Sequence, residues 1–313
     1  MTKSINFLKF RYVFLAVSAL IIIGGIVFGM VTGYKFDIDF KGGTRIQVDL
    51  KESFDEHELS KIVEDTTGKT PIVQKMSSGD SSVIITTDSL SNENADSLVA
   101  ALKAKYTNMD EPSTKNIQPS YGKDLVNSAV LALTVAIVIL LIYIGVRFRN
   151  LGINAAVTAI IALIHDALMV IAVYGVIKFP INSTFIAVIL TIIGYSINDT
   201  IIVYDRIREN RKKITKVNDL EEIINMSITQ TMRRTMYTSL TTIVSIAIVY
   251  IISAINNQQV LMEFSLPLVI GVIIGTYSSI FVASSLWYIF EEIREKNVEK
   301  KSLKKSKNKT NKK

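Results

Sequence analysis

The chain has 313 residues, 49% of them hydrophobic, with a formal net charge of +7 and a mean hydropathy of +0.35. A soluble domain rarely has so apolar a composition, and a sequence without cysteine has neither disulfides nor cysteine-ligated metal sites. The positive charge could indicate an RNA partner, but its concentration in Lys300–Lys313 favours a basic tail beside anionic membrane lipids, and no nucleic acid is expected.

Six long runs that are nearly free of charge predict six transmembrane helices. About 20 apolar residues in a helix cross the ~30 Å hydrocarbon layer, and lipid cannot satisfy open backbone groups. The first run exceeds the ~7–15 residues of a signal-peptide core, so we interpret residues 1–33 as a short N-terminus and an uncleaved helix. The runs are Tyr12–Gly33, Val126–Val146, Ile153–Ile177, Ser183–Tyr204, Tyr237–Ile255 and Phe264–Phe290.

Residues 34–124 form the one sizeable polar segment, and their pattern predicts a small α+β domain. Gly42-Gly43, just before the first strand, is a candidate hinge for it, although a Gly-Gly pair is more often a tight turn. The predicted order β-α-β-β-α-β is the ferredoxin-like plan, which specifies no function by itself. The predicted elements are a strand at Arg45–Leu50, a helix from the capping box Ser53–Glu56 to about Thr67 with Gly68 as its end, strands at Pro71–Met76 and Ser82–Thr87 around a turn at 77–80, a helix at Ser91–Tyr106 and an edge strand within Glu111–Tyr121.

Charges in the short loops predict the orientation of the chain. Lys and Arg gather on one side, at Arg147, Arg149 and within 206–216, whereas the loops of the other side hold only Lys178 and Glu263. Because Lys and Arg stay on the cytoplasmic side, both termini are predicted to be cytoplasmic and the α+β domain to lie outside. Residues 125–290 then contain helices two to six, with an amphipathic cytoplasmic loop at 206–233, and 291–313 form the basic cytoplasmic tail.

Ionisable residues inside the apolar runs are the candidate functional site, because charges in a spanning helix are costly and usually functional. Helix three carries His165-Asp166, helix four carries Asn198-Asp199, and helix five opens with Arg233-Arg234. Helical spacing predicts one polar stripe on each of two helices. These stripes are Thr191, Tyr195, Asn198 and Asp205, with Asp199 beside them, on helix four, and Arg234, Thr238, Thr241 and Ser245 on helix five.

Asp199 and Arg234 are the pair that we expect to carry an ion. At ~1.5 Å per residue, Asp199 lies ~25 Å from the outer end of helix four and Arg234 ~33 Å from that of helix five, so a long arginine side chain reaches the carboxylate. Burial and a nearby arginine act on the carboxyl in opposite directions, which suits a proton relay. A static pair that joins two helices is the alternative, and His165 is about equally a relay or a hydrogen-bonded interior histidine.

Catalytic motifs do not favour an enzyme. The sequence has no G-x-x-x-x-G-K-[ST] loop for ATP, no H-E-x-x-H and no G-x-S-x-G. Asp166 and Asp199 could suggest an intramembrane aspartyl protease, but residues 194–199 lack its G-x-G-D signature. We therefore expect neither catalysis nor a cofactor or bound metal.

Four motifs spread over most of the chain resemble the SecF subunits of the bacterial Sec protein-export machinery. The most specific is IGYSINDT at Ile193–Thr200, which continues as YDRIREN at 204–210. The others are DFKGGT at Asp39–Thr44, LIHD at Leu163–Asp166 and TMRRTMYTSLTT at Thr231–Thr242. The chain departs from the pattern at Asp37, where the family more often has Gly, and at Arg233, and its outer domain matches only in layout and at 117–122.

The resemblance implies a subunit of the bacterial cytoplasmic membrane in the resistance-nodulation-division superfamily. It implies SecD as the partner in a heteromeric complex, with SecYEG, SecA and YajC as further candidate partners. Such subunits use the proton-motive force, or sodium in some members, to help pull unfolded preproteins outward after SecA has pushed them. The family motifs place Asn198, Asp199, Arg234, His165 and Asp166 on the ion pathway.

Three other functions remain open at this stage. An ion-driven exporter of small molecules or lipids would need a large substrate cavity in the outer domain. SecD itself would need a much larger outer segment between helices one and two. A passive assembly factor would support normal export without Asp199.

Overall fold

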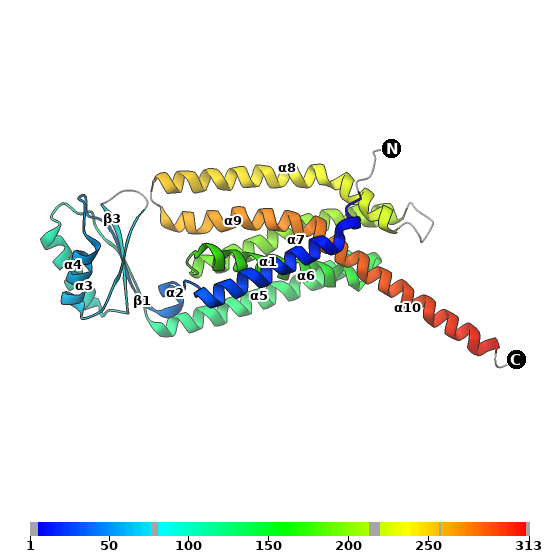
Figure 1. Cartoon of the computed structure of the whole chain (residues 1–313), viewed down its shortest axis with the longest axis horizontal. Coiled ribbons are helices and arrows are strands. Elements are labelled where there is room, and N and C mark those ends of the chain that lie inside the picture. Colours follow the sequence, from blue (N-terminus) through cyan, green and yellow to red (C-terminus); the bar gives the residue numbers. More distant parts are fainter. Residues whose placement is uncertain (1–5, 77–80, 213–219, 257, 311–313) are drawn as a thin grey trace.

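The computed structural model describes residues 6–76, 81–212, 220–256 and 258–310, which form a helical bundle with a small sheet domain at one end (Figure 1). Within these residues, six helical stretches are long and apolar enough to cross a membrane, which confirms the six predicted spans of a multi-pass membrane protein. They are Leu8–Thr32, Ser120–Arg147, Ile153–Ile177, Ser183–Arg211, Leu220–Ile255 and Gln259–Val298.

The helices of the bundle extend beyond the apolar runs into polar sequence. The helix that carries Asp199 continues to Arg211, and the next helix begins at Leu220, long before its apolar run. The elements are a 3-10 turn at Leu8–Phe10, α1 (Arg11–Thr32), α5 (Pro119–Arg147), a 3-10 turn at Arg149–Leu151, α6 (Ile153–Ile177), α7 (Ser183–Arg211), α8 (Leu220–Ile255), α9 (Gln259–Tyr277), a π-helix (Ser278–Ala283) and α10 (Ser284–Thr310).

The predicted amphipathic loop at 206–233 is not a separate surface element. Its described residues are the end of α7 and the first turns of α8. Ile223, Ile224 and Ile228 are buried in the core of the bundle. The apolar stripe was therefore predicted correctly, but it packs against protein rather than against the membrane surface.

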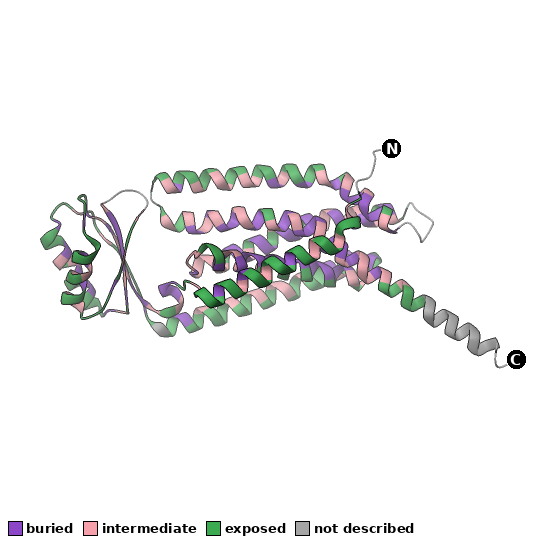
Figure 2. Cartoon of the chain, viewed as in Figure 1, coloured by how far each residue is buried: buried purple, intermediate pink, exposed green. Residues whose placement is uncertain are grey.

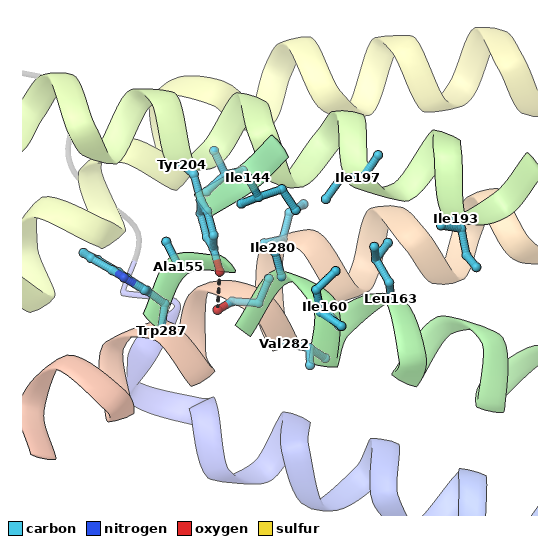
Figure 3. Packing of buried hydrophobic residues seen from close by; sticks show 14 of the residues in the cluster. Ile144, Ala155, Ile160, Leu163, Ile193, Ile197, Tyr204, Ile280, Val282 and Trp287 are labelled. Atoms are coloured by element: carbon cyan, nitrogen blue, oxygen red, sulfur yellow. Dashed lines mark hydrogen bonds between the residues drawn. The ribbon is translucent and has the colours of Figure 1, made fainter. Parts of the chain in front are cut away.

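Central and peripheral helices differ in burial (Figure 2). Much of α6 and α7 is buried, whereas α1, α5 and α8 expose apolar side chains around them, as expected of helices that face lipid. Helix α1 approaches α6 closely at Gly25, where a Cβ atom would lie 2.7 Å from that of Ala172. Tyr204 of α7 and Trp287 of α10 fill the same apolar core (Figure 3).

The α+β domain has four antiparallel strands in the order β2-β3-β1-β4. Its helices cover one face of the sheet, and the core between them contains Ile46, Val48, Leu59, Val63 and Leu98 (Figure 1). The sheet forms because apolar residues alternate along the central strands. In chain order the elements are β1 (Gly43–Asp49), α3 (Glu56–Thr67), β2 (Ile72–Lys75), β3 (Ser82–Thr87), α4 (Asn92–Lys105) and β4 (Ser113–Ile117).

Local signals placed these elements well, with one correction. Gly68 ends α3 in a left-handed conformation and β4 is an edge strand, as predicted, and α4 lies one residue inside the predicted bounds at each end, with Ser91 as its N-cap. The cap of α3 is Asp55, whose side chain accepts from the backbone N–H of His57, rather than Ser53. The predicted turn at 77–80 lies outside the described residues.

The junction between the domain and the bundle is a short segment joined to the loop between α6 and α7. The backbone N–H of Asp37 donates to the carbonyl of Ile181 (2.9 Å), and the N–H of Ile181 donates to the carbonyl of Lys35 (2.8 Å). The one-turn helix α2 (Ile38–Lys41) follows. Its Asp39 side chain is buried and accepts from the first backbone N–H of α7, that of Ser183 (2.8 Å).

Charged pairs and two glycines complete this junction. Asp37 pairs with Arg45 of β1, and Asp39 pairs with Lys115 of β4 (2.7 Å). Gly42 and Gly43 both have positive φ, and a Cβ atom on Gly43 would lie 2.7 Å from the carbonyl oxygen of Thr87. Glycine is required here for a tight connection, and hinge motion at these residues stays a prediction.

Candidate functional site

Asp166 lies where α6, α7 and the π-helix meet, and its side chain is fully buried. Its Oδ2 accepts hydrogen bonds from the hydroxyls of Ser196 on α7 (2.5 Å) and Ser278 on the π-helix (2.8 Å). Its Oδ1 lies 3.0 Å from Nδ1 of His165, whose Nε2 has no hydrogen-bond partner among the described residues. The predicted pair His165-Asp166 is therefore the centre of a polar cluster.

Asp199 is equally buried but differently surrounded. Neither of its carboxylate oxygens has a hydrogen-bond partner within the described part of the chain. The Ser239 hydroxyl and the Arg234 guanidinium, both on α8, are close enough to interact with its charge. Burial of a carboxylate without a hydrogen bond is costly, so Asp199 is a candidate for a functional residue.

The other predicted members of this site do not join Asp199 directly. Arg234 and Asn198 are both exposed in the chain alone, and among the described residues no ion pair within 4 Å joins Arg234 to Asp199. The proposed contact between them is therefore absent from this conformation.

The polar stripe predicted on helix five is correct as a stripe, but it is not the buried one. Arg234, Thr241 and Ser245 point away from the bundle, whereas Thr235 and Ser239 are buried against its other helices. Helical spacing identifies residues that share a face without saying which face meets a neighbour. The hydroxyls of Ser239 and Thr276 of α9 lie 2.6 Å apart, so this second stripe joins α8 to α9.

Asp205, predicted on the stripe of helix four, belongs to an ion-pair cluster at the end of the bundle away from the α+β domain. It pairs with Arg147 of α5 (2.7 Å) and Arg208 of its own helix (2.9 Å). These contacts fasten α5 to α7. They leave Asp166 and Asp199 as the buried carboxylates in the middle of the spans.

Sequence reasoning missed the serines and the π-helix. Ser196 was quoted only as part of a motif, and Ser278 and Ser279 were read as part of an apolar run. The hydroxyl of Ser279 donates to the carbonyl of Ser196 (3.1 Å) and lies 2.9 Å from that of Thr200. The sequence YSSIFVASS at 277–285, with two serine pairs inside an apolar stretch, was the available signal.

The chemistry of this arrangement follows from the kinds of polar side chain that it contains. In the described ranges no three His, Asp or Glu side chains gather as a metal site needs. The polar groups are hydroxyls, two carboxylates and one imidazole, of which the carboxylates and the imidazole exchange protons near neutral pH when their pKa is suitably shifted.

Known proteins resemble this chain over nearly its whole length. The family described as protein export membrane protein SecD/SecF, C-terminal, matches residues 97–293. A protein translocase subunit SecF from Dictyoglomus turgidum is 35% identical over 94% of this chain and all of its own length. The SecF subunit from Haemophilus influenzae is 33% identical over 90% of this chain and 85% of its own.

Longer relatives contain a region that is similar to this chain. A protein translocase subunit SecDF from Bacillus subtilis is 31% identical over 90% of this chain, which covers 37% of the relative. The crystal structure of SecDF from Thermus thermophilus, a translocon-associated membrane protein, superposes with a TM-score of 0.79 at 29% identity. That match covers 93% of this chain and 39% of the solved one.

Proposed function

The chain belongs to the SecD/SecF family of protein-export membrane proteins, and from this premise we propose that it is an ion-driven subunit that assists the export of unfolded preproteins through SecYEG. The observation that carries the ion-driven part is Asp199, a buried carboxylate without a hydrogen bond among the described residues. Moving one charge through 100 mV supplies ~2.3 kcal/mol, enough to bias a conformational step. The subunit needs no ATP site, no cofactor and no catalytic chemistry of its own.

SecD is the partner that the comparisons support best. Relatives exist in which SecD and SecF are one chain, and this chain matches only 37% of such a protein. Polar side chains at Asn198 and Arg234 are exposed inside the spans of the isolated chain, where lipid would leave them unsatisfied. We assign this polar surface to contact with the partner, whose groups would complete the ion pathway. SecA, YajC and the preprotein complete the proposed assembly.

The proposed placement is the bacterial cytoplasmic membrane, with both termini in the cytoplasm and the α+β domain outside. The bias of Lys and Arg in the short loops supports it. The order of the four antiparallel strands, with one helix before β2 and one before β4, supports a ferredoxin-like domain between the first two spans. In this orientation α2 and the start of α7 lie at the outer face.

Export with and without an ion gradient tests the ion-driven role. Asp199→Asn keeps the size of the side chain but cannot ionise, so gradient-dependent completion of export should fall by up to about 50-fold, the factor that corresponds to ~2.3 kcal/mol. Asp205→Asn is the matched control, because it makes the same change on the same helix in a carboxylate held by two arginines. Protein abundance and co-purification with SecD are measured in the same cells.

The outcomes separate the alternatives. Slow export at normal abundance supports the proposal, whereas low abundance of Asp199→Asn indicates a structural role for the carboxylate. Normal export by an abundant Asp199→Asn protein, under proton and sodium gradients alike, removes this residue from the mechanism and favours a passive role for the subunit.

A further inference from the structure

The π-helix Ser278–Ala283 is an interruption of regular helix that neighbouring helices hold in place. Such segments are rare and occur frequently at functional sites. Ser278 donates to Asp166 of α6, and Ser279 donates to the carbonyl of Ser196 of α7. At its other end, the Tyr204 hydroxyl of α7 donates to the carbonyl of Ala283 (3.2 Å). Contacts from α6 and α7 thus stabilise a geometry that the segment would not keep alone.

The charge of Asp166 matters to these contacts. An ionised carboxylate accepts at both oxygens, and here it meets Ser196, Ser278 and His165 at once. A neutral carboxyl or carboxamide can donate to Nδ1 of His165, but the one oxygen that accepts from both serines is then uncharged. Hydrogen bonds to a charged acceptor are also roughly twice as strong as neutral ones. Neutralisation therefore weakens the attachment of Ser278.

We propose that Asp166 is a positioning residue for ion-driven export, which acts through Ser196 and Ser278 as a charge-sensitive latch on the π-helix. The inference rests on the proposed function, in which positive charge arrives in the middle of the bundle in each cycle. With Asp166 ionised, the segment stays in π geometry. With Asp166 neutral, Ser278 is released and the segment relaxes toward α geometry.

The ionisable groups around this latch come from several helices. His165 contacts Asp166 from the same helix, Asp199 lies one turn beyond Ser196 on α7, and Tyr204 lies further along α7. The ring of Tyr277, at the end of α9, has its centroid 6.3 Å from that of His165, and its hydroxyl lies 3.0 Å from that of Ser18 on α1. A single turn of α7 thus separates Asp199 from Ser196, the serine that donates to Asp166.

A change from π to α geometry in this segment would rotate α10, the helix that follows it. Since 3.6 residues make one α-helical turn, each residue of helical register corresponds to about 100° of rotation of the helix that follows. Trp287, one turn into α10, is fully buried, with its ring 6.3 Å from that of Tyr204 and the Arg211 guanidinium 5.9 Å from its centroid. It is the one tryptophan of the chain, so its fluorescence reports this neighbourhood alone.

Fluorescence of the purified full-length chain in detergent tests the latch. Asp166→Asn should shift the emission of Trp287 to longer wavelength and raise its quenching by acrylamide severalfold, because the indole loses its packing. Ser278→Ala should change both in the same direction, and Ser278→Thr, which keeps the hydroxyl, should restore the wild-type values. Ser265→Ala is the control: among the described residues, this buried serine on α9 bonds only within its own helix, to the carbonyl of Leu261 (2.6 Å).

Wild-type emission and quenching in both Asp166→Asn and Ser278→Ala would overturn the latch, as would an equal change in Ser265→Ala. Far-ultraviolet circular dichroism establishes that each variant is folded, and if Asp166→Asn is not, the two Ser278 variants decide. The measurement needs neither partner, gradient nor substrate. An unchanged Trp287 therefore refutes the latch and leaves the export role standing, whereas normal export by Asp199→Asn refutes the ion-driven role and leaves the fluorescence result intact.

Discussion

Asp37 and Asp39, two buried carboxylates at the junction with the α+β domain, are paired with cations, unlike Asp166 and Asp199 in the middle of the bundle. Asp37 pairs with Arg45 and Asp39 with Lys115, whereas in the middle of the bundle Asp166 is held by two serines and a histidine. Asp199 has no hydrogen bond among the described residues. A neighbouring cation and hydrogen bonds from neutral donors both favour the charged form of a carboxylate, whereas burial disfavours it. The charged pairs therefore fasten the junction, and the proposed ion coupling belongs to the middle of the bundle.

Of the substitutions at these carboxylates, Asp166→Asn is expected to lower the free energy of unfolding most. The change weakens two hydrogen bonds to a buried charged acceptor, each worth ~1.5–3 kcal/mol, so we expect a loss of about 3 kcal/mol in the free energy of unfolding. Unfolding of the purified chain, followed by circular dichroism, measures it. An unchanged stability would show that the serines contribute nothing to holding α6, α7 and the π-helix together.

A smaller effect, dependent on pH, is expected at the junction. Burial alone would raise the pKa of Asp39, but hydrogen bonds from Lys115 and Ser183 outweigh it and hold that pKa below its usual range. A depressed folded-state pKa gives stability above the unfolded value of ~3.9 that is lost as pH falls through the folded value. Asp39→Asn should therefore cost about 1–2 kcal/mol at pH 7, and the difference from wild type should vanish in acid.

Amide hydrogen exchange of the segment around Asp37 and Asp39, in the intact protein, measures this loss of stability. Asp49→Asn is the control. The pKa of Asp49 is also held low, chiefly by the backbone N–H of Lys51, but its ion pair with Lys51 is largely exposed. Exposed pairs contribute little, so this variant should exchange like wild type at every pH. Equal responses from the two variants would contradict the junction as a fastening.

The smallest effect on stability is expected from Asp199→Asn. The substitution removes no hydrogen bond that Asp199 makes within the described residues and relieves an unpaired buried charge, so stability should be unchanged or slightly higher. The same unfolding measurement applies as for Asp166→Asn. A loss as large as that of Asp166→Asn would erase the distinction between the two carboxylates.

Features set by local chemistry could be predicted from the sequence. Gly68 and Ser91 act through their own backbone neighbourhood, and the strand at Ser82–Thr87 has the predicted bounds, because turn and capping preferences are local. The six spans could also be predicted, because hydropathy is likewise a property of the local sequence.

Features set by packing could not be predicted in this way. The rotation of α8, which buries Thr235 and Ser239 and exposes Arg234, depends on how neighbouring helices fit against it. The π-helix depends on hydroxyls contributed by other helices, and no propensity of 278–283 indicates it. Asp166 and Asp199 were identified as candidates by their charge, but only the fold shows that one is fully bonded and the other is not.

The attachment of Asp39 to the start of α7 has a mechanical consequence. The same carboxylate holds Lys115 on strand β4 and the first N–H of α7, and the backbone bonds between Asp37 and Ile181 lie beside it. A force that pulls on the α+β domain would thus be transmitted through the side chain of Asp39 to the start of α7, the helix that carries Asp199. Force would then act at one end of α7 and charge near its middle, so that tension outside the membrane and ion occupancy within it oppose or assist each other.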